Sequence, residues 1–100
     1  MEHDVESIIK NTLFRAHALQ RMFQRKIRKD AVFGILISGE VLEEYPDDLP
    51  YPSRLIMGWY EGRPLHVVAA YDSAERKEIV ITVYEPDPNR WDQGLRRRRR

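Results

Sequence analysis

The sequence predicts an α+β domain in which helices come first and an antiparallel sheet follows. Up to Ser38 the apolar residues recur at helical spacing, and after Gly39 they alternate with a period of two or form short runs. These runs are rich in Ile, Val, Leu and aromatic residues and are separated by polar turns, which is typical of a strand meander. Because this order favours segregated layers, we expect two to three N-terminal helices packed on a three- to four-stranded antiparallel meander sheet.

Three segments carry the helical pattern. The first is expected from Val5 to Leu13, with Asp4 as its N-cap. A break at residues 13–15, with room for a short extended piece, precedes a second helix that reaches Ile27. The third helix is expected from Lys29 to Ser38, since Gly39 is a favourable residue just after a helix.

Four segments carry the strand pattern, and two turns fix how they pair. Glu61-Gly62 is a two-residue hairpin turn, so Tyr60 pairs with Arg63 and His66 lies opposite Met57. The polar stretch 72–76 makes the next turn, which places Thr82 and Tyr84 on the same face as His66. The expected strands are Glu40–Tyr45, Arg54–Tyr60, Arg63–Tyr71 and Lys77–Glu85.

Length and composition bound the class of protein. One hundred residues with 42% apolar content form one domain, expected over residues 1–92, with Trp91 folded back onto the sheet and an arginine-rich disordered tail at 93–100. There is no cysteine, and the three histidines lack metal-ligand spacing, so we expect no metal and no cofactor. We expect no membrane contact and a cytoplasmic location, because no apolar run approaches the ~20 residues of a membrane span and the N-terminus lacks a signal-peptide pattern.

Charge is distributed unevenly along the chain. Seven Lys or Arg and no acid lie between Ser7 and Lys29, whereas Glu40–Pro50 holds five acids and no base. The last five residues are all arginine, and because the whole chain carries +1, the remainder carries −4. A polyanion would therefore meet a local basic face rather than a basic molecule. The C-terminal arginines are equally compatible with a solvated tail.

The second helix carries the clearest polar pattern. His17, Arg21 and Arg25 follow one another at one-turn spacing, on the side that we expect to lie opposite the apolar stripe. Arginine binds phosphate through two parallel hydrogen bonds, and histidine transfers protons near neutral pH. Charged runs on helices are more often only solvated faces, and that explanation stays open. The expected apolar stripe is Ala18, Leu19, Met22, Phe23 and Ile27.

A second set of candidates lies on the central strands. His66 occupies an apolar segment, where a lone histidine is more often a hydrogen-bonded core residue than a catalyst. With Thr82 and Tyr84 it forms one face, and we expect the helix ridge to line a cleft against it. RNA cleavage without a metal needs a base for the 2′-hydroxyl, an acid for the leaving oxygen and cations for the phosphorane. Arginine, histidine and tyrosine supply all three.

Several blocks, in the same order, resemble the DUF4258 domain-of-unknown-function family. The resemblance extends over about residues 13–91 and includes Arg25 and Trp91. The chain departs from the family pattern at Lys26, where a glycine is usual, and at Arg28, where a Ser or Thr helix cap is expected. The matching blocks are His17–Met22, Gly39–Asp48, Tyr51–Leu55, Gly62–Val68 and Ile81–Pro88.

This family looks distantly similar to ribonuclease toxins of the RelE, MqsR and BrnT type. The resemblance implies a RelE/barnase-like fold, mRNA cleavage without a metal, and a small antitoxin-like partner protein. It also implies that the family's motif residues are those of the site. Those residues are His17, Arg21, Arg25, His66 and Tyr84.

Two functional hypotheses follow. In the first, the protein is a toxin–antitoxin-type endoribonuclease, with His17 or His66 as general base or acid and Tyr84 as proton donor or base-stacking group. The phosphate- or RNA-binding residues would be Arg21, Arg25, Arg54 and Thr82. In the second, the basic ridge binds RNA or a protein and cuts nothing.

Overall fold

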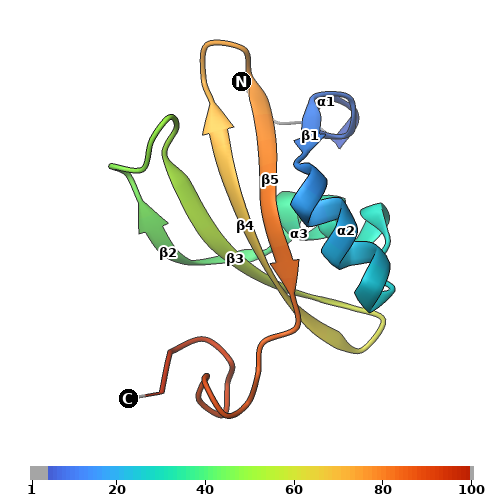
Figure 1. Ribbon diagram of the computed structural model, residues 1–100, viewed down its shortest axis with the longest axis vertical. Helices are drawn as coiled ribbons and strands as arrows, with labels where there is room; N and C mark the ends of the chain where they lie inside the picture. The colour runs from blue at the N-terminus through green and yellow to red at the C-terminus, as the bar shows by residue number, and fades with distance from the viewer. Residues whose placement is uncertain (1–4, 100) are drawn as a thin grey trace.

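The computed structural model describes residues 5–99, which form three helices and five strands. Figure 1 shows the helices gathered along one side of the sheet, with the C-terminal segment running past its lower end. This confirms the α+β class and the upper number of expected helices. The elements are α1 (Val5–Lys10), β1 (Thr12–Phe14), α2 (Ala16–Arg25), α3 (Lys29–Ser38), β2 (Glu40–Tyr45), β3 (Ser53–Tyr60), β4 (Arg63–Asp72) and β5 (Lys77–Tyr84).

The sheet has five strands in the order β1-β5-β4-β3-β2, so the expected count of three to four is wrong. The additional strand, β1, pairs in parallel with β5, and the other pairs are antiparallel. The first helix ends at Lys10, earlier than expected, because the chain turns extended to supply this partner. Hydrogen bonds from Glu78 N to Asn11 O (3.2 Å) and from Arg15 N to Val80 O (3.1 Å) cover part of the β5 edge. The expected cap Asp4 lies outside the described residues.

The predicted register of the central strands is confirmed. Tyr60 pairs with Arg63 and Met57 with His66, and the two residues of the turn, Glu61 and Gly62, have φ angles of 50° and 81°. Two left-handed residues in succession make the type I′ turn that suits the twist of a hairpin. His66 pairs directly with Tyr84, so both side chains lie on one face as expected.

The helices cover the other face of the sheet. Alternate residues Leu65 and Val67 point toward them, and α2 packs on β5 while α3 packs on β3. Since His66 lies between these two residues, its side chain points away from the helices. The apolar core on the helix side consists of Ala18, Met22, Ile27, Ala31, Val32, Ile35, Ile56, Leu65, Val67, Ala69, Val80 and Val83.

The faces of α2 differ from the expectation. Ala18 and Met22 are buried, but Leu19 is exposed and Phe23 is 86% exposed, whereas Arg21 is half-buried. At about 100° per residue, Arg21 and Arg25 lie within roughly 60° of Ala18. The basic ridge therefore borders the buried stripe of the helix instead of lying opposite to it.

The structure describes the C-terminal segment as far as residue 99, which includes most of the stretch expected to be a disordered tail. Trp91 and Arg98 form an antiparallel bridge, and the flanking bonds from Asp92 N to Arg97 O and from Arg99 N to Arg90 O are both 2.7 Å long. We call residues 90–99 the C-terminal hairpin. Trp91 anchors it and is only 3% exposed, which confirms that this side chain folds back onto the sheet.

Candidate functional site

His66 is enclosed beneath the C-terminal hairpin. Its ring has no exposed surface, and the Trp91 ring meets it edge-on with 4.5 Å between centroids. His66 Nε2 lies 2.8 Å from Leu95 O, and because a carbonyl only accepts, Nε2 carries the hydrogen. In the neutral ring Nδ1 is then an acceptor, and the Tyr84 hydroxyl, 3.2 Å away, donates to it.

Burial sets the protonation of this pair. It lowers the pKa of His66 from 6.5, with the Arg98 charge acting in the same direction and the Leu95 hydrogen bond against it. Burial also raises the pKa of Tyr84 above 10.0. At neutral pH the imidazole is therefore uncharged and the phenol keeps its proton, so the Tyr84 hydroxyl is a proton donor to the lone pair of His66 Nδ1.

A pocket of about 370 Å³ opens beside Tyr84, where the ends of α2 and β5 meet the hairpin. Its charges are partly compensated, since Arg63 pairs with Glu85 at 3.3 Å and Glu43 pairs with Arg98 at 3.3 Å. A volume of this size accommodates a small ligand such as a nucleotide. The lining residues are Arg25, Tyr84, Glu85, Asp87, Arg90, Trp91 and Arg98.

The structure brings together only part of the predicted constellation. Arg25 and Tyr84 line the pocket, and His66 lies behind Tyr84. His17 is about 12 Å from Arg25 along the helix axis, and neither it nor Arg21 is among the residues lining this pocket. Of the three ridge residues that were expected to line a cleft, only the last, Arg25, therefore lines this pocket. Thr82 shares the face of Tyr84 but lies two pairs further along the strand, opposite Val68.

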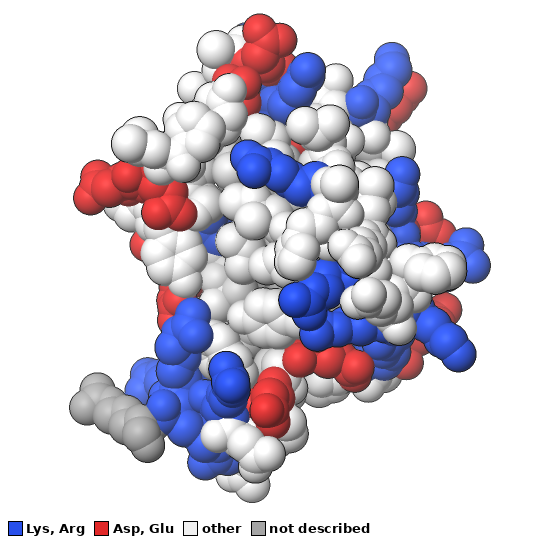
Figure 2. All heavy atoms as spheres, viewed as in Figure 1, with Lys and Arg blue, Asp and Glu red and all other residues white. Residues whose placement is uncertain are grey.

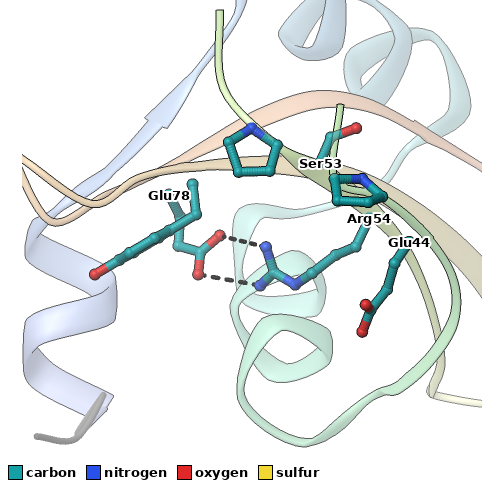
Figure 3. A pocket seen from close by; sticks show the side chains of 7 residues that line it. Glu44, Ser53, Arg54 and Glu78 are labelled. Atoms are coloured by element: carbon teal, nitrogen blue, oxygen red, sulfur yellow. Dashed lines mark hydrogen bonds and ion pairs between the residues drawn. The ribbon is translucent and has the colours of Figure 1, made fainter. Parts of the chain in front are cut away.

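Arg54 lies in a different pocket, at the far end of the sheet, and its guanidinium is occupied. Both of its terminal nitrogens are 3.1 Å from a carboxylate oxygen of Glu78, and Figure 3 shows the two parallel contacts beside Glu44 and Ser53. The Arg54 side chain is 23% exposed and that of Glu78 only 9%. A bidentate pair of this kind holds the guanidinium in the geometry that a phosphate would need. Arg54 is thus placed as a structural partner of Glu78, away from the other candidates.

Sequence reasoning did not identify the contacts that close the site. Glu43 on β2 accepts hydrogen bonds from Tyr45 and Arg98, and these lower its pKa in that order, Tyr45 more than Arg98. Arg98 also lies 4.6 Å from the Trp91 ring centre. The available signal was the charge pattern, because an acidic strand and an arginine run in one small domain attract each other.

Within the part of the chain that the structure describes, no group of three His, Asp or Glu side chains is arranged to hold a metal ion. Nor is any described helix long and apolar enough to cross a membrane.

Comparison with known proteins gives one match. The model of a family described as "Domain of unknown function (DUF4258)" matches residues 14–85. No curated protein and no solved structure matches the chain. The matched segment contains Arg25, His66 and Tyr84, and it ends before the C-terminal hairpin begins.

Proposed function

The chain belongs to the DUF4258 family, and we propose that it is a metal-independent endoribonuclease of the toxin–antitoxin type. The observation that carries the proposal is the convergence of three matched residues. Arg25 and Tyr84 line one pocket, and the Tyr84 hydroxyl is hydrogen-bonded to a neutral, buried His66. This is a cation beside a proton relay, which is what RNA cleavage by the adjacent 2′-hydroxyl requires.

The proposed step moves one proton through Tyr84. The 2′-oxygen of the substrate attacks the phosphorus and gives its proton to Tyr84 Oη, while the phenol proton passes to His66 Nδ1. The bond to the 5′-oxygen breaks, and this oxygen takes a proton from water. The hydroxide that remains is neutralised by the proton that His66 returns through Tyr84, so that the pair recovers its starting state. The products are a 2′,3′-cyclic phosphate and a 5′-hydroxyl end. Leu95 O fixes the tautomer that leaves Nδ1 free to accept.

The cations stabilise the negative charge that develops on the phosphoryl oxygens. Arg25 stands at the last turn of α2, and Arg90 lines the same pocket from the C-terminal hairpin. Of the two carboxylates in the lining, Glu85 is paired with Arg63, which reduces its repulsion of a phosphate. Arg25 is therefore the principal phosphate-binding residue of the proposal.

In this proposal the protein binds RNA and a small antitoxin-like protein. Its location is cytoplasmic, and its fold has a RelE/barnase-like arrangement. The basic segment from Lys10 to Lys29, which contains α2, supplies the charge that attracts RNA. His17 and Arg21 contribute to this attraction from outside the pocket, as binding residues in the proposal.

The test is cleavage of a single-stranded RNA in the presence of EDTA, with detection of 2′,3′-cyclic phosphate ends. Tyr84→Phe removes the relay and is expected to reduce the cleavage rate by about 10²–10⁴-fold. Tyr60→Phe, which removes a half-buried phenol hydroxyl elsewhere, is the matched control. Arg25→Gln is expected to lose activity, whereas Arg76→Gln, in the exposed turn between β4 and β5, is expected to keep it. A folded wild-type protein that releases no such ends would refute the proposal.

One observation favours a second candidate, a non-catalytic RNA-binding module. His66 has no exposed surface and both of its ring nitrogens are satisfied, as in an ordinary core histidine. In that case RNA binding depends on salt and on Arg25 but is unchanged in Tyr84→Phe and His66→Asn. The absence of cleavage products together with this binding pattern would decide for the module.

A further inference from the structure

We propose that three arginines of the C-terminal hairpin, Arg90, Arg97 and Arg99, form a phosphate-binding surface that guides single-stranded RNA into the pocket beside Tyr84. The proposal rests on RNA as the ligand of the proposed function and adds a binding surface outside the family match. Figure 2 shows Lys and Arg side chains gathered over the C-terminal segment at the lower left of the molecule.

The pairing of the hairpin separates its arginines into two sets. Opposite residues of an antiparallel pair point to the same side, and successive residues point to opposite sides. Trp91 and Arg98 are opposite each other, and both point inward, because Trp91 packs on His66 and Arg98 bonds to Glu43. Arg96, two residues before Arg98, bonds to Glu40 at 2.7 Å. These two arginines therefore attach the hairpin to β2.

The remaining arginines of the hairpin lie on its outer side. Arg90 is opposite Arg99, and Asp92 is opposite Arg97, so these residues share the side that faces away from the sheet. Asp92 carries the one negative charge among these four residues, and its Oδ1 accepts from the backbone of Gly94 at 3.1 Å and of Arg96 at 3.3 Å. The outer surface is consequently a row of guanidinium groups fixed on a hairpin.

This row leads to the pocket. Arg90 belongs to the outer set and also lines the pocket with Arg25 and Tyr84. A pocket of about 370 Å³ between aromatic and guanidinium groups has room for one nucleotide, whereas the paired bases of a duplex cannot enter it. Phosphates along the arginine row and one nucleotide in the pocket therefore fit a single strand.

The experiment measures binding of an all-2′-O-methyl oligonucleotide, which cannot be cleaved, over a range of salt concentrations. Arg97→Gln/Arg99→Gln is expected to weaken binding about tenfold at low salt and to reduce the slope of log K against log salt by about 1.4, at roughly 0.7 per phosphate contact. The control, Arg76→Gln/Lys77→Gln, removes the same charge from the last residue of the β4–β5 turn and the first residue of β5, at the other end of the sheet. It is expected to keep the wild-type slope.

The outcomes are distinguishable from those of the proposed function. Equal losses in the two double variants, or equal affinity for a duplex of the same sequence, would overturn the inference. So would tight binding to phosphatidylserine vesicles without binding to the oligonucleotide. Slope-specific loss in Arg97→Gln/Arg99→Gln supports the surface even if the wild-type protein cleaves no RNA, in which case only the endoribonuclease proposal fails.

Discussion

The two faces of the sheet are closed by different physical means. On the helix side, α2 and α3 cover Leu65, Val67 and their neighbours with apolar side chains, and the core residues there include Ala18 and Val32 with 0% exposure. On the other side, the C-terminal hairpin covers a histidine. It is attached by one tryptophan and by ion pairs whose side chains are about half exposed.

The two faces differ in what they contribute: the helix face contributes stability, and the hairpin face carries the candidate chemistry. The helix face is closed by burial of apolar area, which is non-directional and involves no titrating group or ion pair. The hairpin face holds a buried titratable group next to a pocket, and its closure depends on charge. The family match covers the first closure and ends before the second. The hairpin lies outside the match, and its Trp91 covers the matched residue His66.

The largest expected effect is a cavity on the helix face. Leu65 is 1% exposed in the helix-side core, so Leu65→Ala is expected to lower the free energy of unfolding by about 2–5 kcal/mol. Trp91→Ala removes a larger side chain from the hairpin face, yet we expect a smaller global loss, because the hairpin detaches without opening the core. Urea denaturation of both variants measures the comparison. If Trp91→Ala lowers the free energy of unfolding as much as Leu65→Ala does, the hairpin unfolds cooperatively with the core.

The next effect is a pH dependence of the free energy of unfolding, which we expect from the hairpin face because His66 is buried there. The pKa of His66 is lowered by burial in the folded protein, so the unfolded chain binds a proton more readily. The stabilisation is complete above pH 6.5, the ordinary value, and is lost as pH falls toward the lowered pKa. Urea denaturation at pH 7 and pH 5 should show the decrease in wild type and in His17→Gln. It should be absent in His66→Asn.

Much of the sheet was predictable because its signals are local. The Glu61-Gly62 turn fixed the register of β3 and β4, and the period-two pattern identified the segments around it. A short extended piece was expected near residue 13, but its pairing as β1 was not predictable, since three residues carry too little periodicity and the partner lies more than sixty positions later. The hairpin was missed for a related reason, because an arginine run is compositionally identical to a solvated tail.

The candidate site was predictable only as far as the strand register extends. That register placed His66 beside Tyr84, but the burial of His66 depends on Trp91 and Leu95, which lie beyond the sheet. The helix ridge was misplaced because an amphipathic pattern does not show which border of the apolar stripe meets the sheet. Phe23, expected to be buried, is the clearest example.

We expect a smaller change in the free energy of unfolding from a substitution at the end of α2, on the helix side of the sheet. Lys26 has φ 56°, a left-handed conformation that costs a residue with a Cβ about 1 kcal/mol more than glycine. Lys26→Gly is therefore expected to raise the free energy of unfolding by about 0.5–1 kcal/mol, since Arg63 still bonds to the carbonyl of residue 26 at 2.9 Å. Thermal denaturation measures the change. A loss of stability would show that the lysine side chain contributes more than the backbone strain removes.

The smallest expected effect is the one that tests the hairpin closure most directly. Arg96–Glu40 and Arg98–Glu43 are exposed ion pairs, each worth about 0–1 kcal/mol, and 1 M salt shortens the screening length to roughly 3 Å. Salt, or the double variant Glu40→Gln/Glu43→Gln, should therefore speed hydrogen exchange at the amides of Asp92 and Arg99, which close the hairpin. The amide of Val67, in the helix-side core, should be unchanged. If salt leaves exchange at Asp92 and Arg99 unaffected, the ion pairs do not hold the hairpin, and Trp91 together with the His66–Leu95 hydrogen bond closes this face of the sheet.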